Sequence, residues 1–265
     1  ATISSSVPRD GHLFIVINGA YGHRMAKICS VHRIKHTTLV FAENENPSIE
    51  KAETALKNDN SITHLAIVHS ETTTGIFNPV HEFGSLAKKY NKVYIVDAMS
   101  SFGAVPVNVS DSRIDFLVSS SNKCIEGVPG FSFIIVNKEK LQQCKGQARS
   151  LVLDIFAQWE GLENDGQFRF TPPTHSLAAF HKALEELEEE GGVDSRANRY
   201  KENYQTLVAN CLKILEPHVA KALPVKLLEE AYRIQLNPRF FYQEKVVAYS
   251  NTTRHHASKL TELFE

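Results

Sequence analysis

The stretch from Tyr94 to Phe133 decides the fold class, and it reads YIVDAMSSFGAVPVNVSDSRIDFLVSSSNKCIEGVPGFSF. Short apolar runs at 94–96, 114–118 and 131–136 are typical of strands that are buried on both faces of a sheet. The first run ends at Asp97, and the second leads through a polar cluster to Lys123. Because open α/β sheets bind ligands beyond the carboxyl ends of their strands, this acid and this amine are the first candidates for a functional site.

The residues before this stretch alternate between strand-like and helix-like patterns. Strands are expected at 12–17, 37–42 and 64–69, and helices at 21–32, 46–57 and 79–90. Such alternation indicates βαβ units and a mostly parallel central sheet with helices on its faces.

The pattern changes after Lys138. A helix is expected at 176–190, with its EELEEE run as a solvated face and with an apolar face made of Leu177, Phe180, Leu184 and Leu187. A long amphipathic helix follows at 193–215, and residues 223–241 have the composition of an interrupted strand. We therefore expect a large α/β domain over 1–175, incomplete at its N-terminus, and connecting helices with the remnant of a small α/β domain over 176–265.

The composition narrows the class of protein. The 265 residues carry a net charge of −1, so no global basic field favours nucleic acid. No apolar run reaches the roughly 20 residues that a membrane span needs, and the first residues do not resemble a signal peptide. The four cysteines form no CxxC pair, which argues against a zinc site or a disulfide framework. We expect a cytoplasmic protein without metal, with an organelle as the alternative location.

Lys123 is the first residue with a chemical role to test. Most lysines lie on the surface, but Lys123 follows a buried type of strand and precedes a glycine-rich turn. An amine that is partly desolvated at such a place becomes a nucleophile that forms Schiff bases with carbonyl compounds. The pattern therefore indicates a site for pyridoxal phosphate.

Asp97 fits the same interpretation. A carboxylate at the end of a buried strand needs a partner, and the protonated ring nitrogen of pyridoxal phosphate is a suitable one. The alternative is that Asp97 caps the helix that follows it.

Hydroxyl and amide side chains near these two residues are candidates for cofactor contacts. Thr72 follows a strand end, as Asp97 does, although turn formation alone also explains a threonine-rich loop. Asn122 and Ser120 are candidates for a phosphate contact. Three further residues are expected to serve the structure rather than the chemistry: His69, His81 and Cys124.

Five motifs in the chain resemble those of the 2-aminoethylphosphonate–pyruvate transaminase family, in the fold-type I, class V branch of pyridoxal-phosphate enzymes. They are NGAYGHRMAKIC (18–29), HSETTTGIFNPV (69–80), VDAMSSFGAVPV (96–107), SSSNKCIEGVPGFSF (119–133) and RFTPPTH (169–175). The block around SNKCIEGVPGF is the most diagnostic one. The resemblance covers roughly residues 1–215 and implies a fold-type I large domain.

The resemblance also implies residue roles. Lys123 would bind the cofactor covalently and carry a proton between the substrate Cα and C4′ of the cofactor, while Asp97 would hold the pyridine nitrogen. The other implied contacts are Thr72 with the ring hydroxyl, Asn122 and Ser120 with the phosphate, Tyr21 with the ring face, and Thr171 with the phosphate of the neighbouring subunit in a homodimer.

Two departures from the family pattern stand out. Family members have a longer N-terminal region with a Ser-Gly-Thr turn, which holds the cofactor phosphate at a helix start. They also have a small-domain arginine for the acidic group of the substrate, for which Arg233 and Arg239 are the nearest candidates here.

The predicted reaction is amino transfer from 2-aminoethylphosphonate to pyruvate, giving phosphonoacetaldehyde and L-alanine. Two alternatives remain. One is another class V transaminase, acting on alanine and glyoxylate or on serine and pyruvate. The other is a truncated, catalytically impaired paralogue that serves as a binding or dimerisation partner.

Overall fold

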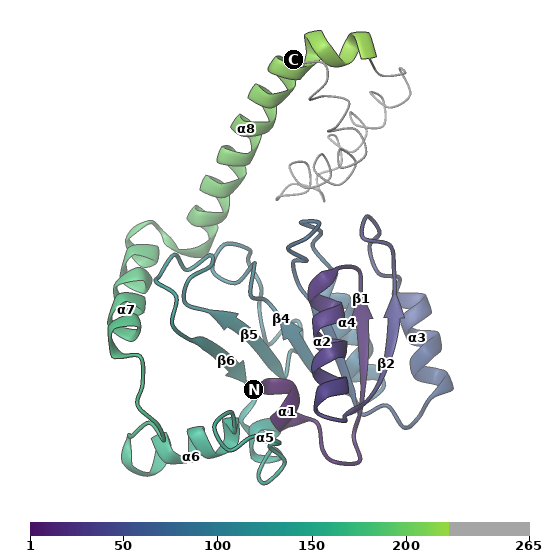
Figure 1. Ribbon diagram of the computed structural model, residues 1–265, viewed down its shortest axis with the longest axis vertical. Coiled ribbons are helices and arrows are strands. Elements are labelled where there is room, and N and C mark those ends of the chain that lie inside the picture. The colour runs from purple at the N-terminus through teal and green to yellow at the C-terminus, as the bar shows by residue number, and fades with distance from the viewer. Residues whose placement is uncertain (223–265) are drawn as a thin grey trace.

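The computed structural model describes residues 1–222, and its centre is a six-stranded sheet in the order β2-β1-β3-β4-β5-β6 (Figure 1). The first five strands run parallel, and β6 runs antiparallel to β5. The predicted mostly parallel α/β sheet is thereby confirmed. The expected strand at 223–241, Arg233 and Arg239 lie outside the described residues. The strands are β1 (His12–Ile17), β2 (Lys35–Val40), β3 (His64–Val68), β4 (Val93–Asp97), β5 (Phe116–Ser120) and β6 (Ser132–Val136).

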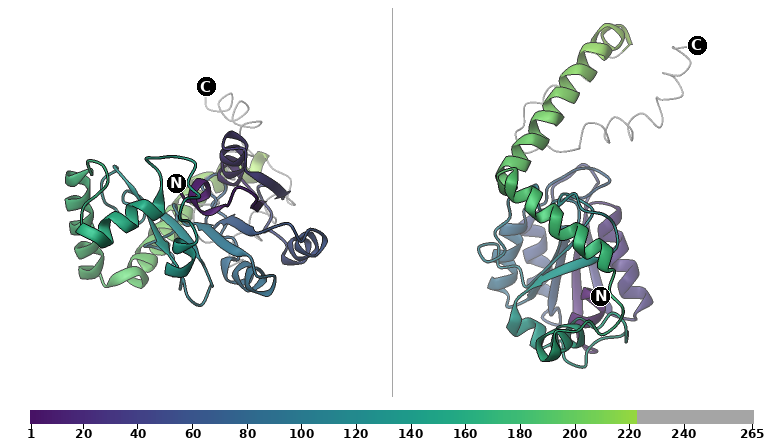
Figure 2. Two further views of the ribbon diagram at one scale, coloured as in Figure 1. Left: turned by 90° about the horizontal axis from the view of Figure 1, so that it is seen from below. Right: turned by 90° about the vertical axis from the view of Figure 1, so that its left-hand side faces the viewer.

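Helices cover both faces of this sheet. They are α1 (Thr2–Ser6), α2 (Ala20–Val31), α3 (Ile49–Asn58), α4 (Val80–Lys89), α5 (Lys138–Gln142), α6 (Ile155–Asp165), α7 (Thr174–Glu189) and α8 (Gly192–Ala222). The long helix α8 extends away from the sheet (Figure 2). Within the described part of the chain, every helix is too short or too polar to cross a bilayer.

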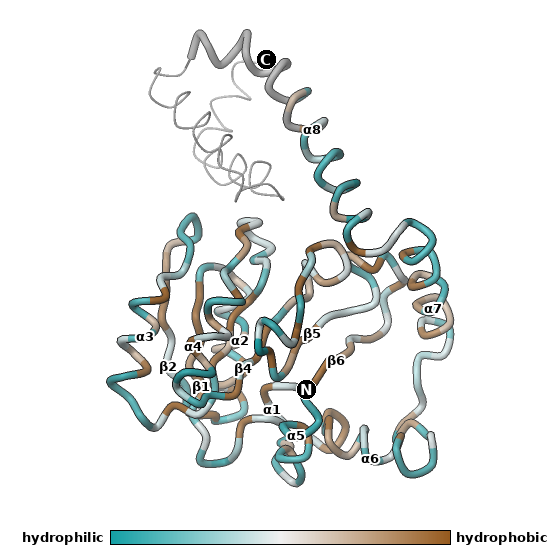
Figure 3. The backbone as a smooth tube through the Cα atoms, turned by 180° about the vertical axis from the view of Figure 1, so that it is seen from behind, coloured by the Kyte–Doolittle hydropathy of each residue, from teal (hydrophilic) through white to brown (hydrophobic). Residues whose placement is uncertain are grey.

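Alternate residues of the strands enter two separate cores. Phe14, Val16, Leu65 and Ile67 pack with α3 and α4 on one face. Their neighbours in sequence pack with α1, α2, α5 and α6 on the other face, and they include Leu13, Ile15, Ile17 and Ala66. Burial on both faces explains why β1, β3 and β5 contain continuous apolar runs. The apolar run of β6 is also visible in Figure 3, but every residue of this edge strand is exposed or half-buried, so the burial on both faces predicted for 131–136 is wrong.

The buried face of α7 differs from the predicted one. Ala183 and Leu187 are buried, whereas Leu184 is 40% exposed. Residues 183 and 187 are four apart and share one side of the helix, so Leu184 is turned away from the cluster that they form with Ile125. The EELEEE run is also not a uniform solvated face, because Glu190 at its end pairs with two arginines of α8. The predicted domain boundary at residue 175 stays a prediction.

The strand order fixes where a ligand site is expected. The parallel strands β1, β3, β4 and β5 all end at the same edge, the upper one in Figure 1. The chain order reverses between β1 and β3, which makes their carboxyl ends a topological switch point. Loops that begin at Asn18, His69, Ala98 and Ser121 therefore gather at this edge.

Candidate active site

Three of these loops meet at Ser100. The Ser100 hydroxyl lies 2.5 Å from Oγ1 of Thr72, in the loop after β3. The Ser100 carbonyl accepts a hydrogen bond from Sγ of Cys124, at 3.4 Å, in the loop after β5. Ser100 itself lies three residues after Asp97. The structure thus brings together Thr72, the turn after Asp97 and the residue that follows Lys123.

Asp97 ends β4 with a largely buried carboxylate. Its Oδ1 accepts a hydrogen bond of 2.9 Å from the backbone N–H of Met99, and its carbonyl accepts one of 2.8 Å from His69. Burial raises the pKa of the Asp97 carboxyl, although the Met99 N–H and the charge of Arg24 act in the opposite direction. The predicted alternative, a cap of the next helix, does not hold, because the segment after Asp97 is a series of turns that leads to β5.

Lys123 lies in the turn after β5 and its side chain is exposed, so the predicted partial burial is wrong for the described residues. The reason is local. The N–H of Glu126 donates to the carbonyl of Lys123 at 2.8 Å and closes a tight turn. Ile125 occupies the inner side of this turn and is only 2% exposed. Lys123, two residues earlier, therefore presents its amine on the open side.

The two predicted phosphate contacts differ in exposure. Asn122 is exposed beside Lys123. Ser120 is 7% exposed, and its hydroxyl has no hydrogen-bond partner within the described part of the chain. A buried hydroxyl without a hydrogen-bond partner lowers the stability of the fold. The Ser120 hydroxyl is therefore available to bind a polar group that residues 1–222 do not supply.

Glu71 is a site residue that sequence reasoning missed. It is completely buried, and its carboxylate accepts the backbone N–H groups of Tyr21 at 3.1 Å and Gly22 at 3.3 Å. These N–H groups belong to the first turn of α2, where a negative charge is favourable. Burial nevertheless raises the pKa of the Glu71 carboxyl.

The backbone of Gly19 allows this contact. A Cβ atom at Gly19 would lie 2.0 Å from Cγ of Glu71, so only glycine fits there without a shift of the buried carboxylate. The signal in the sequence was an Asn-Gly pair that directly follows β1 and an acid three residues after the end of β3. Glu71 thereby fixes the start of α2 and the backbone of Tyr21.

Tyr21, the predicted ring-stacking residue, is half-buried at this edge. The guanidinium of Arg24 lies 4.6 Å from the centre of its ring, which restrains the ring from one side. The hydrogen bond from the N–H of Tyr21 to the carboxylate of Glu71 connects Tyr21 to the loop that carries Thr72. Four of the predicted residues therefore lie at one edge of the sheet, namely Tyr21 at the start of α2, Asp97 at the end of β4, and Thr72 and Lys123 in loops.

His69 supports the turn after Asp97. It is 6% exposed, and its Nδ1 lies 2.9 Å from the hydroxyl of Ser101. Burial lowers the pKa of His69 to about 4, which favours the neutral ring. This arrangement agrees with the structural role predicted for His69.

Thr171 is exposed in the segment between α6 and α7. The contacts described for residues 1–222 do not join it to Lys123, and its predicted role concerns a neighbouring subunit. That role stays a prediction.

Comparison with known proteins agrees with this geometry. Residues 14–227 match the family model described as Aminotransferase class-V. The chain is 55% identical over 216 residues to the bifunctional phosphonoacetaldehyde hydrolase/aminoethylphosphonate transaminase of Clostridioides difficile, covering 81% of the chain and 34% of that protein. It is 48% identical over 234 residues to the 2-aminoethylphosphonate–pyruvate transaminase of Vibrio vulnificus, covering 88% of the chain and 64% of that relative.

Solved structures share the fold. The alanine–glyoxylate aminotransferase of Nostoc superposes with a TM-score of 0.70 at 24% identity, over 82% of the chain and 56% of that protein. The pyridoxamine–pyruvate aminotransferase of Mesorhizobium loti gives 0.69 at 25% identity, over 75% of the chain and 51% of that protein. The chain thus spans less than two thirds of the relatives named here. By its match over residues 14–227 and its likeness to these relatives, the chain belongs to the class-V aminotransferase family.

Proposed function

We propose that the protein catalyses the pyridoxal-phosphate-dependent transfer of the amino group of 2-aminoethylphosphonate to pyruvate, which gives phosphonoacetaldehyde and L-alanine. The observation that carries the proposal is the meeting at Ser100 of the loops that hold Thr72, Asp97 and Lys123. Relatives named for an aminoethylphosphonate transaminase are 45% to 55% identical to the chain, which supports the choice of substrate.

The residues at this edge fit the proposed cofactor. When bound, pyridoxal phosphate supplies a carbonyl that condenses with amines and a protonated ring that accepts an electron pair. Burial raises the pKa of the Asp97 carboxyl, so a cation beside it, such as a protonated ring nitrogen, would relieve the cost of the buried charge. The exposed amine of Lys123 is accessible to a carbonyl.

Each chain residue then has a defined task. Asp97 would hold the proton on the ring nitrogen, and Thr72 would donate to the ring hydroxyl. Tyr21 would cover one face of the ring, and Asn122 and Ser120 would contact the phosphate. Lys123 would remove the proton from Cα of the substrate as a general base.

We also propose that the protein acts as a homodimer in the cytoplasm, with Thr171 contributing to the site of the neighbouring subunit. Large apolar side chains are exposed close to this residue in sequence, which supports an interface there. They are Leu151, Val152, Leu153, Leu162, Phe168 and Phe170.

Reduction with borohydride in the presence of pyridoxal phosphate tests the proposal. The expected result is a cofactor adduct that peptide mass mapping assigns to Lys123 and that Lys123→Ala removes. Absence of the adduct at saturating cofactor would favour the impaired-paralogue alternative. Once the adduct is found, the cofactor absorbance is followed on addition of 2-aminoethylphosphonate, alanine or serine. A response to alanine or serine alone would favour the other class V transaminases.

A further inference from the structure

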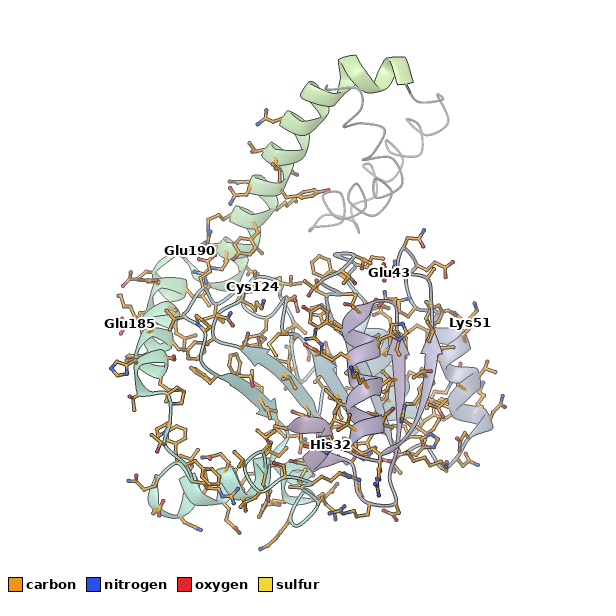
Figure 4. All side chains as sticks on the ribbon, in the orientation of Figure 1. His32, Glu43, Lys51, Cys124, Glu185 and Glu190 are labelled. Atoms are coloured by element: carbon orange, nitrogen blue, oxygen red, sulfur yellow. The ribbon has the colours of Figure 1, made fainter. Side chains whose placement is uncertain are left out.

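A buried arginine donates hydrogen bonds to the backbone of the turn that carries Lys123. The side chain of Arg196, near the start of α8, is only 3% exposed. Its Nη1 donates to the carbonyl of Cys124 at 2.9 Å and to that of Ile125 at 3.1 Å. These carbonyls belong to the two residues that directly follow Lys123. Figure 4 shows Cys124 close to Glu190, just before the start of α8.

Glu190 holds the other side of the Arg196 guanidinium. Its Oε2 accepts from Nε at 2.9 Å and from Nη2 at 2.7 Å of Arg196. Arg199 completes the group, because its Nε donates to Oε1 of Glu190 at 2.7 Å and its Nη2 lies 3.0 Å from both carboxylate oxygens of Glu126. Two arginines and two glutamates therefore balance in charge, which a buried guanidinium requires.

The turn is held at further points along its length. The N–H of Gly127 donates to the carbonyl of Ser121 at 2.9 Å, and Oγ of Ser121 donates to the carbonyl of Val128 at 2.7 Å. Glu126 has a φ of 64°, a conformation that costs a residue other than glycine roughly 1 kcal/mol. Its carboxylate accepts from Arg199 and from the hydroxyl of Tyr200 at 2.5 Å, so α8 stabilises this strained residue.

We propose that Arg196 is a positioning residue for Lys123. Its two bonds to the carbonyls of Cys124 and Ile125 fix the turn from which the amine of Lys123 projects, and they couple that amine to α8. The proposal rests on the proposed role of Lys123 in binding the cofactor. The ion pair of Arg196 with Glu190 is sufficient to join α8 to the end of α7. The two hydrogen bonds to the carbonyls of Cys124 and Ile125 add nothing to that junction, and they act on the turn that carries Lys123.

The test replaces Arg196 with lysine in the full chain. Lysine keeps the charge and loses the planar set of donors that reaches both carbonyls and Glu190 together. Hydrogen exchange of the amides of residues 122–127 is expected to accelerate ~10-fold, because the turn opens more often. The cofactor concentration that half-saturates borohydride fixation on Lys123 is expected to rise ~10-fold, corresponding to about 1.4 kcal/mol.

Arg149→Lys is the matched control. Arg149 also donates to backbone carbonyls in another part of the fold, from Nη1 to those of Val7 at 2.6 Å and Ser4 at 3.4 Å and from Nη2 to that of Pro8 at 3.0 Å. This variant is expected to change the exchange of residues near Val7 and to leave both readouts at the Lys123 turn as in the unaltered protein.

Three outcomes separate the possibilities. If Arg196→Lys accelerates exchange in α7 and α8 but leaves the 122–127 amides and the half-saturating concentration unchanged, Arg196 is structural only and the proposal is overturned. If the unaltered chain forms no adduct, the proposed function fails, and the exchange data still decide whether Arg196 holds the turn. If Arg196→Lys does not fold, Glu190→Gln takes its place, with the same two readouts expected to change in the same direction.

Discussion

Two buried carboxylates at the carboxyl edge of the sheet differ in the hydrogen bonds that they accept. Glu71 receives two backbone N–H groups from the first turn of α2, so its charge is used within the fold. Within the described part of the chain, the Asp97 carboxylate receives one N–H donor, that of Met99. Burial raises the pKa of both carboxyls, so the charge with the single donor is the less compensated of the two. Asp97 is therefore the carboxylate whose stabilisation a bound cation would improve, which makes it the residue for a test of chemistry rather than of folding.

Asp97→Ala is expected to leave the cofactor able to react with Lys123 and to lower transaminase turnover by on the order of 10³-fold, as for the loss of an electrostatic contact made to the reacting system. Borohydride fixation measures the first property, and steady-state kinetics with 2-aminoethylphosphonate and pyruvate measures the second. Retention of near-full activity by Asp97→Ala would show that Asp97 does not hold the ring nitrogen.

The sequence contained enough to find Asp97 and Lys123, because each follows a recognisable apolar run. It did not reveal that Lys123 is exposed or that Glu71 is buried. Exposure of Lys123 depends on which residue of the turn points inward, and that is settled by the packing of Ile125 against α7. A glutamate in a threonine-rich loop has no apolar pattern around it that would mark it as buried.

Among the elements, the start of α2 depends on a single small residue. Gly19 precedes α2, and an added Cβ would lie 2.0 Å from Cγ and 2.4 Å from Cδ of Glu71. Glu71 is fully buried and accepts two N–H groups from the first turn of α2, so a displacement of its side chain would break these hydrogen bonds. The start of α2 and the Glu71 carboxylate therefore form one packed unit.

Gly19→Ala is expected to lower the free energy of unfolding by about 2 kcal/mol through overpacking and the strain on the bonds from Tyr21 and Gly22. Urea unfolding measures this change. Gly161→Ala in α6 is the control, since its Cβ would lie no closer than 3.4 Å to a neighbouring atom and alanine favours a helix. Equal stability of the two variants would contradict the close packing of Gly19 against Glu71.

Most elements could be predicted from the sequence, because strands buried on both faces and helices with one apolar face have distinct periods. The helices expected at 46–57 and 79–90 are present as α3, which Ser48 caps, and α4, whose Phe83, Leu86 and Ala87 are buried. Contacts between residues far apart in the chain were harder to predict from the sequence. Arg196 reads as a surface residue of an amphipathic helix, and only the turn around Lys123, 72 residues away at Cys124, gives it buried partners.

At the scale of the whole molecule, three buried histidines of the described residues make the stability of the fold depend on pH. Burial lowers the pKa of His12, which is 2% exposed, and the two histidines with the larger shifts lie in and just after β3. His64 in β3 and His69 just after it are 4% and 6% exposed, and burial lowers the pKa of each to about 4. Since the ordinary pKa is near 6.5, the unfolded chain binds protons first as the pH falls. The folded state is therefore most stable above about pH 6.5, where these histidines are neutral in both states, and it loses stability progressively towards pH 4.

The free energy of unfolding is therefore expected to fall between pH 6.5 and 4, by up to about 3 kcal/mol for each histidine. Urea unfolding at several pH values in this range measures the slope. His69→Gln is expected to flatten it, whereas replacement of the exposed His23 by glutamine is not. An unchanged slope in His69→Gln would mean that His69 is not buried as a neutral ring.

The strand order β2-β1-β3-β4-β5-β6 has a consequence for synthesis on the ribosome. Each described strand pairs with one that is at most two strands away in the chain, so the sheet can be assembled outward from β1 as the strands emerge. After β2 has paired with one side of β1, the other side stays open until β3 is made. Because β1 reads HLFIVI and is buried throughout in the finished protein, its open side can aggregate during this interval, and the emergence of β3 ends the interval.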